Sequence, residues 1–157
     1  MIEKLDFSMQ TVFQLANIEK ECFGRDAWSI NALVGEFHNQ FSHFFACEID
    51  GKIAGYACVR IMYEEAQICN IAVLPEHRRK GIATRLLETV ANFAKESGCE
   101  RAELEVNVAN LPAVELYRKC GYNEQGIRKN FYRKSRYASR DAYTMVLPLV
   151  ENVENPA

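Results

Sequence analysis

The sequence predicts a mixed α/β domain, with a mostly antiparallel central sheet of about seven strands and about four helices that cover both faces. Three observations predict this fold. Strand and helix periodicities follow one another in the order β-α-α-β-β-β-α-β-α-β-β. Residues 68–74 are nearly all apolar, which is typical of a strand covered on both sides. The chain has 157 residues without a recognisable linker, so residues 1–149 are predicted to form a single domain, followed by a polar tail at 150–157.

The first half of the chain is predicted to form a strand, two helices and a hairpin. A helical spacing of apolar side chains breaks at Gly24, and Ser29 is a good N-cap for the second helix. Asp50-Gly51 separates two β-rich runs and is a strong hairpin signal. The predicted strands are residues 1–7, 43–49 and 53–63, and the predicted helices are residues 9–24 and 29–39.

The second half is predicted to alternate strands and helices before a final pair of strands. The helix after Gly81 has one apolar stripe, and Asn110 is a good N-cap for the next helix. Between them, alternating apolar residues face the core, while Glu105 and Asn107 lie on the opposite, polar face. The predicted strands are residues 66–74, 101–107, 122–127 and 141–148, the helices are 82–97 and 110–120, and a long basic connection covers 128–140.

Composition and charge exclude several classes of protein. The net charge of −2 argues against a general nucleic-acid binder. No apolar run approaches the ~20 residues that span a bilayer, and the acid-bearing N-terminus does not resemble a signal peptide. Six scattered cysteines and three histidines form no zinc-binding pattern, so no metal site is predicted. We expect a cytoplasmic protein without a membrane partner, in which the cysteines are small, buried and reduced.

A basic loop between a strand and a helix is the first candidate site. Arg78, Arg79, Lys80 and Gly81 lead directly into the predicted helix. Three cations at the positive end of a helix dipole are unfavourable unless an anion binds there. Unpaired backbone N–H groups at a helix N-terminus bind phosphate, and a glycine lets the ligand approach. The loop therefore predicts a phosphate site, although a solvated basic helix start is the alternative.

The spacing Arg78-x-x-Gly81-x-Ala83 resembles the acetyl-CoA loop of the GNAT acetyltransferase superfamily. The runs L-E-V-N-V-A-N at 104–110 and A-V-E-L-Y-R-K-C-G-Y at 113–122 are similar to a second block of that superfamily, and more closely to bacterial ribosomal-protein alanine N-acetyltransferases. The resemblance covers residues 18–149. It implies a GNAT fold and acetyl-CoA as the donor substrate. The cofactor-binding residues that it implies are Ile71, Ala72, Val73, Arg78, Arg79, Lys80, Gly81, Ile82, Ala83, Thr84 and Asn110.

The same resemblance assigns catalytic roles to Glu105 as general base and Tyr117 as general acid. A protein α-amine has a pKa of about 7.7–8.0, so it is partly neutral at pH 7. A base that removes its proton must be well placed but need not be strong. A tyrosine is protonated at neutral pH and can donate to a departing thiolate. The residues alone leave other interpretations open. Glu105 fits an exposed carboxylate paired with a cation, and periodicity by itself favours a half-buried core position for Tyr117.

The acceptor must be inferred from the basic connection and from Trp28. Cations surround aromatic residues throughout 128–140, a composition that is compatible with nucleic-acid binding or with a solvated loop. The family resemblance favours a third interpretation, in which Tyr132 and its neighbours close over the N-terminus of a peptide. Trp28 then lines the other side of the groove or, alternatively, belongs to the core.

The leading hypothesis is an acetyl-CoA-dependent N-acetyltransferase that acts by direct attack on the N-terminal α-amine of a protein, such as a ribosomal protein alanine. A lysine side chain or a small-molecule amine is the alternative acceptor. A non-catalytic acyl-CoA-binding or RNA-associated module is the alternative from another class. The presence of both Glu105 and Tyr117 counts against that module, because a binder needs neither an acid nor a base.

Overall fold

The fold is a seven-stranded mixed sheet flanked by four α-helices, described here by a computed structural model for residues 1–150. The predicted polar tail lies outside the described residues after Val150. The helices are α1 (Met9–Phe23), α2 (Ile30–Phe37), α3 (Ile82–Glu96) and α4 (Leu111–Lys119). The strands are β1 (Ile2–Leu5), β2 (Ser42–Ile49), β3 (Lys52–Met62), β4 (Glu65–Val73), β5 (Arg101–Asn107), β6 (Asn123–Arg128) and β7 (Ala142–Pro148). The predicted order of elements is therefore confirmed.

The helix caps and the hairpin turn form at the residues that the sequence predicts. The Ser29 hydroxyl accepts a hydrogen bond from the Ala32 amide at 3.1 Å and caps α2, which ends at Phe37, two residues earlier than predicted. The Asn110 carboxamide caps α4 in the same way. Asp50 and Gly51 both have positive φ values, 52° and 76°, which match the twist of the hairpin that joins β2 to β3.

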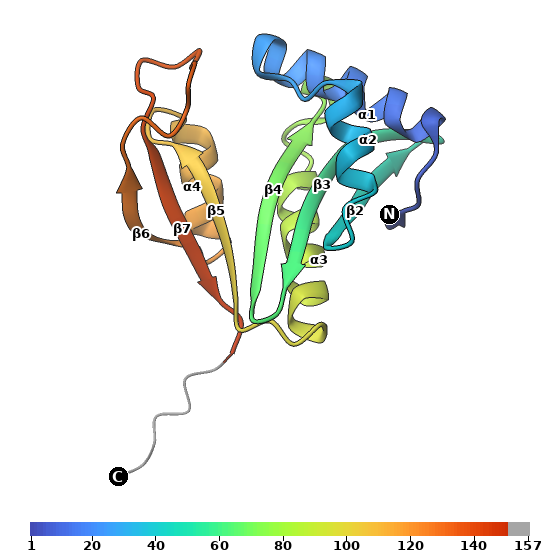
Figure 1. The fold of residues 1–157 in the computed structure, drawn as a ribbon. Coiled ribbons are helices and arrows are strands. Elements are labelled where there is room, and N and C mark those ends of the chain that lie inside the picture. The colour runs from blue at the N-terminus through green and yellow to red at the C-terminus, as the bar shows by residue number, and fades with distance from the viewer. Residues whose placement is uncertain (151–157) are drawn as a thin grey trace.

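The sheet has the order β1-β2-β3-β4-β5-β7-β6, and every neighbouring pair is antiparallel except β4 and β5. The β4–β5 pair is parallel and short, because only Glu65, Ala66 and Gln67 of β4 have partners on β5. Beyond these residues the two strands diverge, and Figure 1 shows β4 and β5 meeting at one end and separating toward the other. The divergence opens the sheet at its centre.

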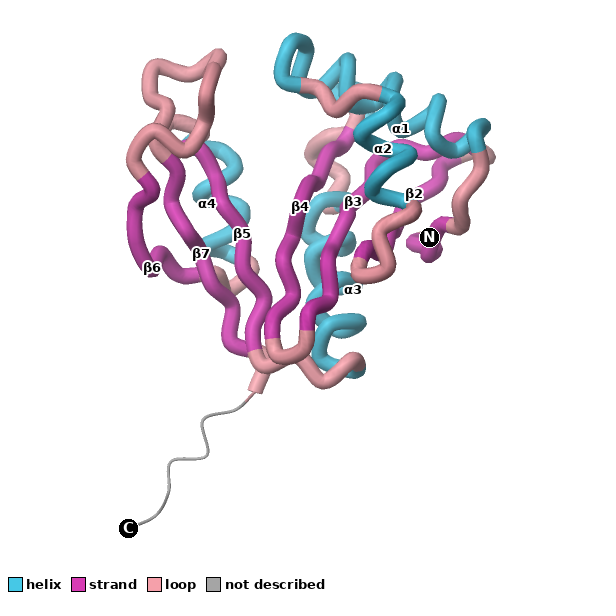
Figure 2. The backbone as a smooth tube through the Cα atoms, in the orientation of Figure 1, coloured by secondary structure: helices cyan, strands magenta, loops and turns pink. Residues whose placement is uncertain are grey.

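Two hydrophobic cores lie on opposite faces of the sheet. α3 and α4 cover one face, where Leu86 and Val114 are buried in the larger core. α1 and α2 cover the other, where Leu15 and Leu33 pack against Phe44 of β2. Figure 2 shows α1 and α2 on one side of β3 and β4, and α3 on the other. Helices on both faces are thus confirmed. Within residues 1–150, no helix is both long and apolar enough to cross a membrane.

Candidate active site

A large cleft occupies the space between the diverging strands. It has a volume of about 1020 Å³ and lies between β4 residues such as Asn70 and β5 residues such as Glu105. A second cavity of about 630 Å³ continues from it along α3 and α4. The two cavities share the lining residues Phe23, Ile71, Asn110, Ala113, Tyr117, Arg136 and Tyr137. They therefore form one continuous path through the open sheet, which suits two substrates that must meet.

The second cavity brings together most of the residues predicted to bind the cofactor. Its lining includes Ile71, Ala72, Val73, Arg78, Arg79, Gly81, Ile82, Ala83, Thr84 and Asn110. Lys80 is the exception: it does not line the cavity, and its ammonium lies 3.1 Å from the ring nitrogen Nδ1 of His77. Nine residues between Ile71 and Thr84, from the end of β4, the loop and the start of α3, thus surround one cavity. Asn110, the N-cap of α4, also lines it.

The loop geometry leaves helix N–H groups available to an anion. Gly81 is the N-cap of α3, has a left-handed φ of 75°, and offers no side chain to the amides that follow. Arg79 also has a positive φ of 63°. The Arg78 guanidinium donates through Nε to the Val73 carbonyl at 3.1 Å and ties the loop to the end of β4. The unpaired amides and the positive end of the helix dipole fit a pyrophosphate.

Glu105 lies on β5 at the point where the sheet opens. Its Oε2 accepts a hydrogen bond from the Gln67 amide at 2.9 Å, and its Oε1 lies 3.8 Å from the guanidinium of Arg128. Only 10% of the Glu105 side chain is exposed. The carboxylate is therefore held in one orientation by a neighbouring strand, and it lines the larger cavity rather than pointing into bulk solvent.

Tyr117 is buried on α4 and lines both cavities. Burial raises its pKa, and the nearby Tyr132 hydroxyl adds to the shift. The Tyr117 hydroxyl therefore keeps its proton at neutral pH. Its ring also packs edge to face on Tyr122, with centroids 6.0 Å apart. Tyr117 is at once a core residue and a cavity residue, so the two interpretations from the sequence are compatible.

The basic connection 128–140 folds over the larger cavity. Tyr132 lines this cavity, and burial together with the charge of Glu105 raises its pKa to about 12. Arg136 reaches across to α1, where it donates to the Cys22 carbonyl at 2.9 Å and lies over the Phe23 ring. Trp28 lines the opposite wall. The connection is therefore a wall of the larger cavity. Closure over the N-terminus of a peptide stays a prediction.

Asn107 holds this connection in place. It lines the same cavity as Glu105, but it is only 5% exposed, which its place on the polar face of the strand does not predict. Its Nδ2 donates to the Ser135 hydroxyl at 3.0 Å and to the Ser139 carbonyl at 2.8 Å. The connection covers it, and no local pattern in the sequence reveals a contact between residues about 30 positions apart in the chain.

A buried carboxylate beneath the site was also missed. Glu19 of α1 is 0% exposed, and its Oε1 accepts hydrogen bonds from the Tyr56 hydroxyl and the Asn70 amide. Burial raises the pKa of Glu19 to about 7, and the hydrogen bonds offset that effect only in part. Asn70 also lines the larger cavity. A glutamate within an amphipathic helix gives little indication in the sequence that it faces the core.

Comparisons with known proteins agree with this geometry. Residues 9–122 match the model of the acetyltransferase (GNAT) family. This chain belongs to the GNAT acetyltransferase family. It is therefore an acyltransferase, and the expected fold and enzyme class are confirmed, whereas the non-catalytic alternative is not supported.

Individual relatives of this GNAT chain are N-acetyltransferases by name. One is the ribosomal protein bS18-alanine N-acetyltransferase of Escherichia coli (strain K12), 32% identical over 122 residues, or 78% of this chain and 81% of that protein. Another is the N-alpha-acetyltransferase of Sulfurisphaera tokodaii, 35% identical over 119 residues, or 68% of this chain and 69% of that protein. A crystal structure of the ribosomal-protein-S18-alanine N-acetyltransferase from Escherichia coli superposes with a TM-score of 0.85 at 28% identity and covers 100% of this chain and 99% of that one.

Proposed function

We propose that this protein transfers the acetyl group of acetyl-CoA to the α-amine of a protein N-terminus, and that the acceptor is an alanine of a ribosomal protein. The observation that carries the proposal is the continuous path through the open sheet, with Glu105 facing one cavity and Tyr117 facing both. The names of two relatives, an N-alpha-acetyltransferase and a ribosomal protein bS18-alanine N-acetyltransferase, support the choice of acceptor.

Acetyl-CoA is the donor substrate in this proposal and fits the second cavity. The amides that follow Gly81 and the guanidinium groups of Arg78 and Arg79 contact its pyrophosphate. The end of β4 offers backbone groups of Ile71 and Val73 to the pantetheine arm. The thioester then lies where the two cavities join, beside Tyr117.

The acceptor amine enters from the larger cavity between Trp28 and Tyr132. Glu105 accepts a proton from the α-ammonium, and the neutral nitrogen attacks the thioester carbonyl carbon. Backbone N–H groups near Val73 stabilise the oxyanion that forms. The carbon–sulfur bond breaks, and the attacking nitrogen loses its second proton to solvent as it becomes the new amide. Tyr117 donates a proton to the departing sulfur and is reprotonated from solvent. Free CoA and the acetylated N-terminus are the products.

The direct test is thiol release by the purified protein with acetyl-CoA and an alanine-starting peptide, with the product mapped by mass spectrometry. We expect Glu105→Gln and Tyr117→Phe each to lower kcat by about 10²–10⁴-fold, the range for lost acid–base catalysis. Glu115→Gln and Tyr63→Phe are matched controls at exposed positions. Full activity of both active-site variants would contradict the assigned roles.

A panel of acceptors separates the proposed substrate from its alternatives. The alanine peptide is compared with the same peptide carrying a blocked N-terminus and a free lysine, and with a small polyamine. We expect turnover of the free N-terminus alone. A lysine ammonium has a pKa of about 10.4, so it holds its proton far more tightly than an α-ammonium does. Preferred turnover of the lysine peptide or the polyamine would overturn the acceptor assignment and leave the acetyltransferase chemistry intact.

A further inference from the structure

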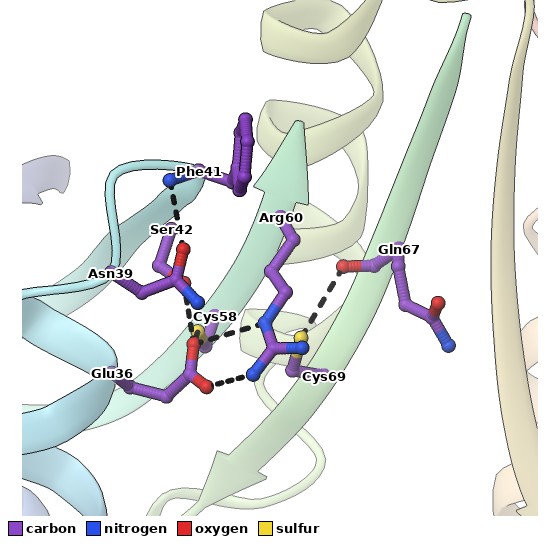
Figure 3. Close-up of polar contacts among 8 residues, drawn as sticks. All are labelled: Glu36, Asn39, Phe41, Ser42, Cys58, Arg60, Gln67 and Cys69. Carbon is purple, nitrogen blue, oxygen red and sulfur yellow. Dashed lines mark hydrogen bonds and ion pairs between the residues drawn. The ribbon is translucent and has the colours of Figure 1, made fainter. Parts of the chain in front are cut away.

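Three side chains with metal-binding chemistry meet on the face of the sheet covered by α1 and α2. They are Glu36 of α2, Cys58 of β3 and Cys69 of β4, and their carboxylate oxygen and sulfur atoms all lie within 4.8 Å of one another. Figure 3 shows these side chains converging between the helix and the two strands. The reaction proposed above uses none of them. Each comes from a different element, so tertiary packing alone brings them together.

A β-bulge creates the pair of thiols. Cys58 pairs with Asn70, whereas the next residue, Val59, pairs with Ile68. Cys69 is therefore the extra residue on β4. Successive residues of a regular strand point to opposite faces, and a bulge redirects one of them. Both sulfurs consequently belong to the same face, because Cys58 is buried in the smaller core and Cys69 packs against it.

Arg60 supplies the charge that such a cluster needs. It lies two residues after Cys58 on β3, donates through Nε to Glu36 Oε2 at 3.2 Å, and makes a second ion-pair contact with Oε1. Ser42 donates its hydroxyl to the same carboxylate and fixes its orientation. Two thiolates and a carboxylate carry a charge of −3, and a divalent cation together with the Arg60 guanidinium balances it. A buried site is favourable only when its charges are compensated in this way.

We propose that Glu36, Cys58 and Cys69 bind a thiophilic divalent cation of the Zn²⁺ class. Thiolate and carboxylate ligands suit this cation, and tetrahedral coordination places such ligand atoms roughly 3.5–3.8 Å apart. The Cys58 sulfur already lies 4.0 Å from Glu36 Oε2. Binding needs only a small side-chain contraction, and it releases the two thiol protons to solvent. The carboxylate keeps its Oε1 contact with Arg60.

The position of the site relates it to the acceptor cavity. Cys69 lines that cavity, and the adjacent Asn70 both lines it and donates to Glu19. The fourth coordination position is therefore open to water from the cavity.

The test is Co²⁺ titration of the reduced, full-length protein under anaerobic conditions, followed by Zn²⁺ competition with a chromophoric chelator. We expect thiolate-to-cobalt charge-transfer absorption that saturates at one equivalent and disappears on adding Zn²⁺. Cys69→Ser and Cys58→Ser should each weaken affinity by at least about tenfold, the minimum seen when even an outer-shell partner of a metal is lost. Cys120→Ser is the matched control, a half-buried cysteine outside the cluster.

Cys58 is fully buried, so Cys58→Ser can lose metal binding simply because the variant does not fold. Cys69→Ser and Glu36→Gln keep the test decisive, and circular dichroism confirms their fold. The absence of cobalt–thiolate absorption in the parent protein would overturn the proposal. So would unchanged affinity in Cys69→Ser, or a mass two hydrogens lower that shows a Cys58–Cys69 disulfide under the same reducing conditions.

Discussion

At the scale of single residues, the position of Glu105 depends on a neighbour that does not contact substrate in the proposed reaction. Gln67 is the last residue of β4 that pairs with β5. Its side-chain amide donates a hydrogen bond to the Glu105 carboxylate, where the two strands begin to diverge. It is a positioning residue, because its amide fixes the carboxylate oxygen that does not face Arg128. Hydrogen bonds to charged groups contribute about 1.5–3 kcal/mol, so this contact is worth measuring by itself.

We expect Gln67→Leu to lower kcat by about tenfold while the KM for acetyl-CoA stays unchanged, since the lost bond is worth about 1.5–3 kcal/mol. Gln125→Leu, at an exposed position of β6, is the control. A rise in KM without any change in kcat would show that Gln67 binds substrate instead.

Glu19 makes folding stability depend on pH. Its pKa is raised from 4.5 to about 7 in the folded protein, so the native state binds this proton more tightly than the unfolded chain. Its contribution is fully present below pH 4.5 and is lost as the pH rises toward 7. The shift corresponds to about 3 kcal/mol. We expect Glu19→Gln to flatten this dependence between pH 5 and pH 8, measured by denaturant unfolding.

His43 makes stability depend on pH in the opposite direction. Burial lowers the pKa of His43, so its contribution to stability is lost as the pH falls. The informative quantity is therefore the difference between the parent and Glu19→Gln at each pH. Glu21→Gln, at an exposed position of the same helix, should leave the profile unchanged. Parallel pH profiles of the parent and Glu19→Gln would contradict the assignment.

At the scale of elements, α3 has a left-handed glycine beside each of its ends, and the proposed donor site lies at its N-terminus. Gly81 starts the helix with a φ of 75°, and Gly98 follows its C-terminus with a φ of 88°. A Cβ on either glycine would meet no atom within 4 Å. Both positions therefore require a left-handed backbone conformation, whereas only Gly81 lies beside the proposed pyrophosphate site.

We expect Gly81→Ala and Gly98→Ala to lose similar stability, about 1–2 kcal/mol each, because alanine is strained in the left-handed region. The affinity for CoA should fall about tenfold in Gly81→Ala alone, which corresponds to ~1.4 kcal/mol. Calorimetric titration with CoA and thermal unfolding measure the two effects separately. Equal affinities in the two variants would remove this helix N-terminus from the donor site.

At the scale of the whole molecule, the two parts of the sheet are joined by little direct pairing. The parallel contact between β4 and β5 spans three residue pairs, and an ion pair at 3.2 Å between Arg101 and Glu65 closes its end. Beyond it, the contact of Arg136 with α1 spans the gap on the acceptor side. A ligand in the second cavity contacts both parts of the sheet, because β4 and α4 both line that cavity.

Because of this arrangement, CoA should stabilise the whole domain. At a CoA concentration about 100 times Kd, the expected gain is about 2.7 kcal/mol. For a chain of this size that gain raises Tm by roughly 5–10 °C. Thermal unfolding with and without CoA checks the prediction, with the Gly81→Ala variant as the control that responds less. A Tm that does not move at saturating CoA would contradict the placement of the donor cleft.

The sequence by itself determined the order of the elements, because their signals are local. Ser29 and Asn110 cap their helices through bonds to amides three residues away, and Asp50-Gly51 folds its hairpin through its own φ angles. The loop from Arg78 to Gly81, which is the proposed phosphate site, is equally local, since one strand, one turn and one helix build it. These features needed no knowledge of what packs against them.

Tertiary structure alone decided which side chains meet. Glu19 became a buried carboxylate because α1 packs on β3, and Asn107 became buried because a distant connection folds over it. The bulge at Cys69 and the short β4–β5 pairing depend on registers between strands. Such contacts join residues far apart in the chain, and their energies depend on burial and geometry that no local pattern records.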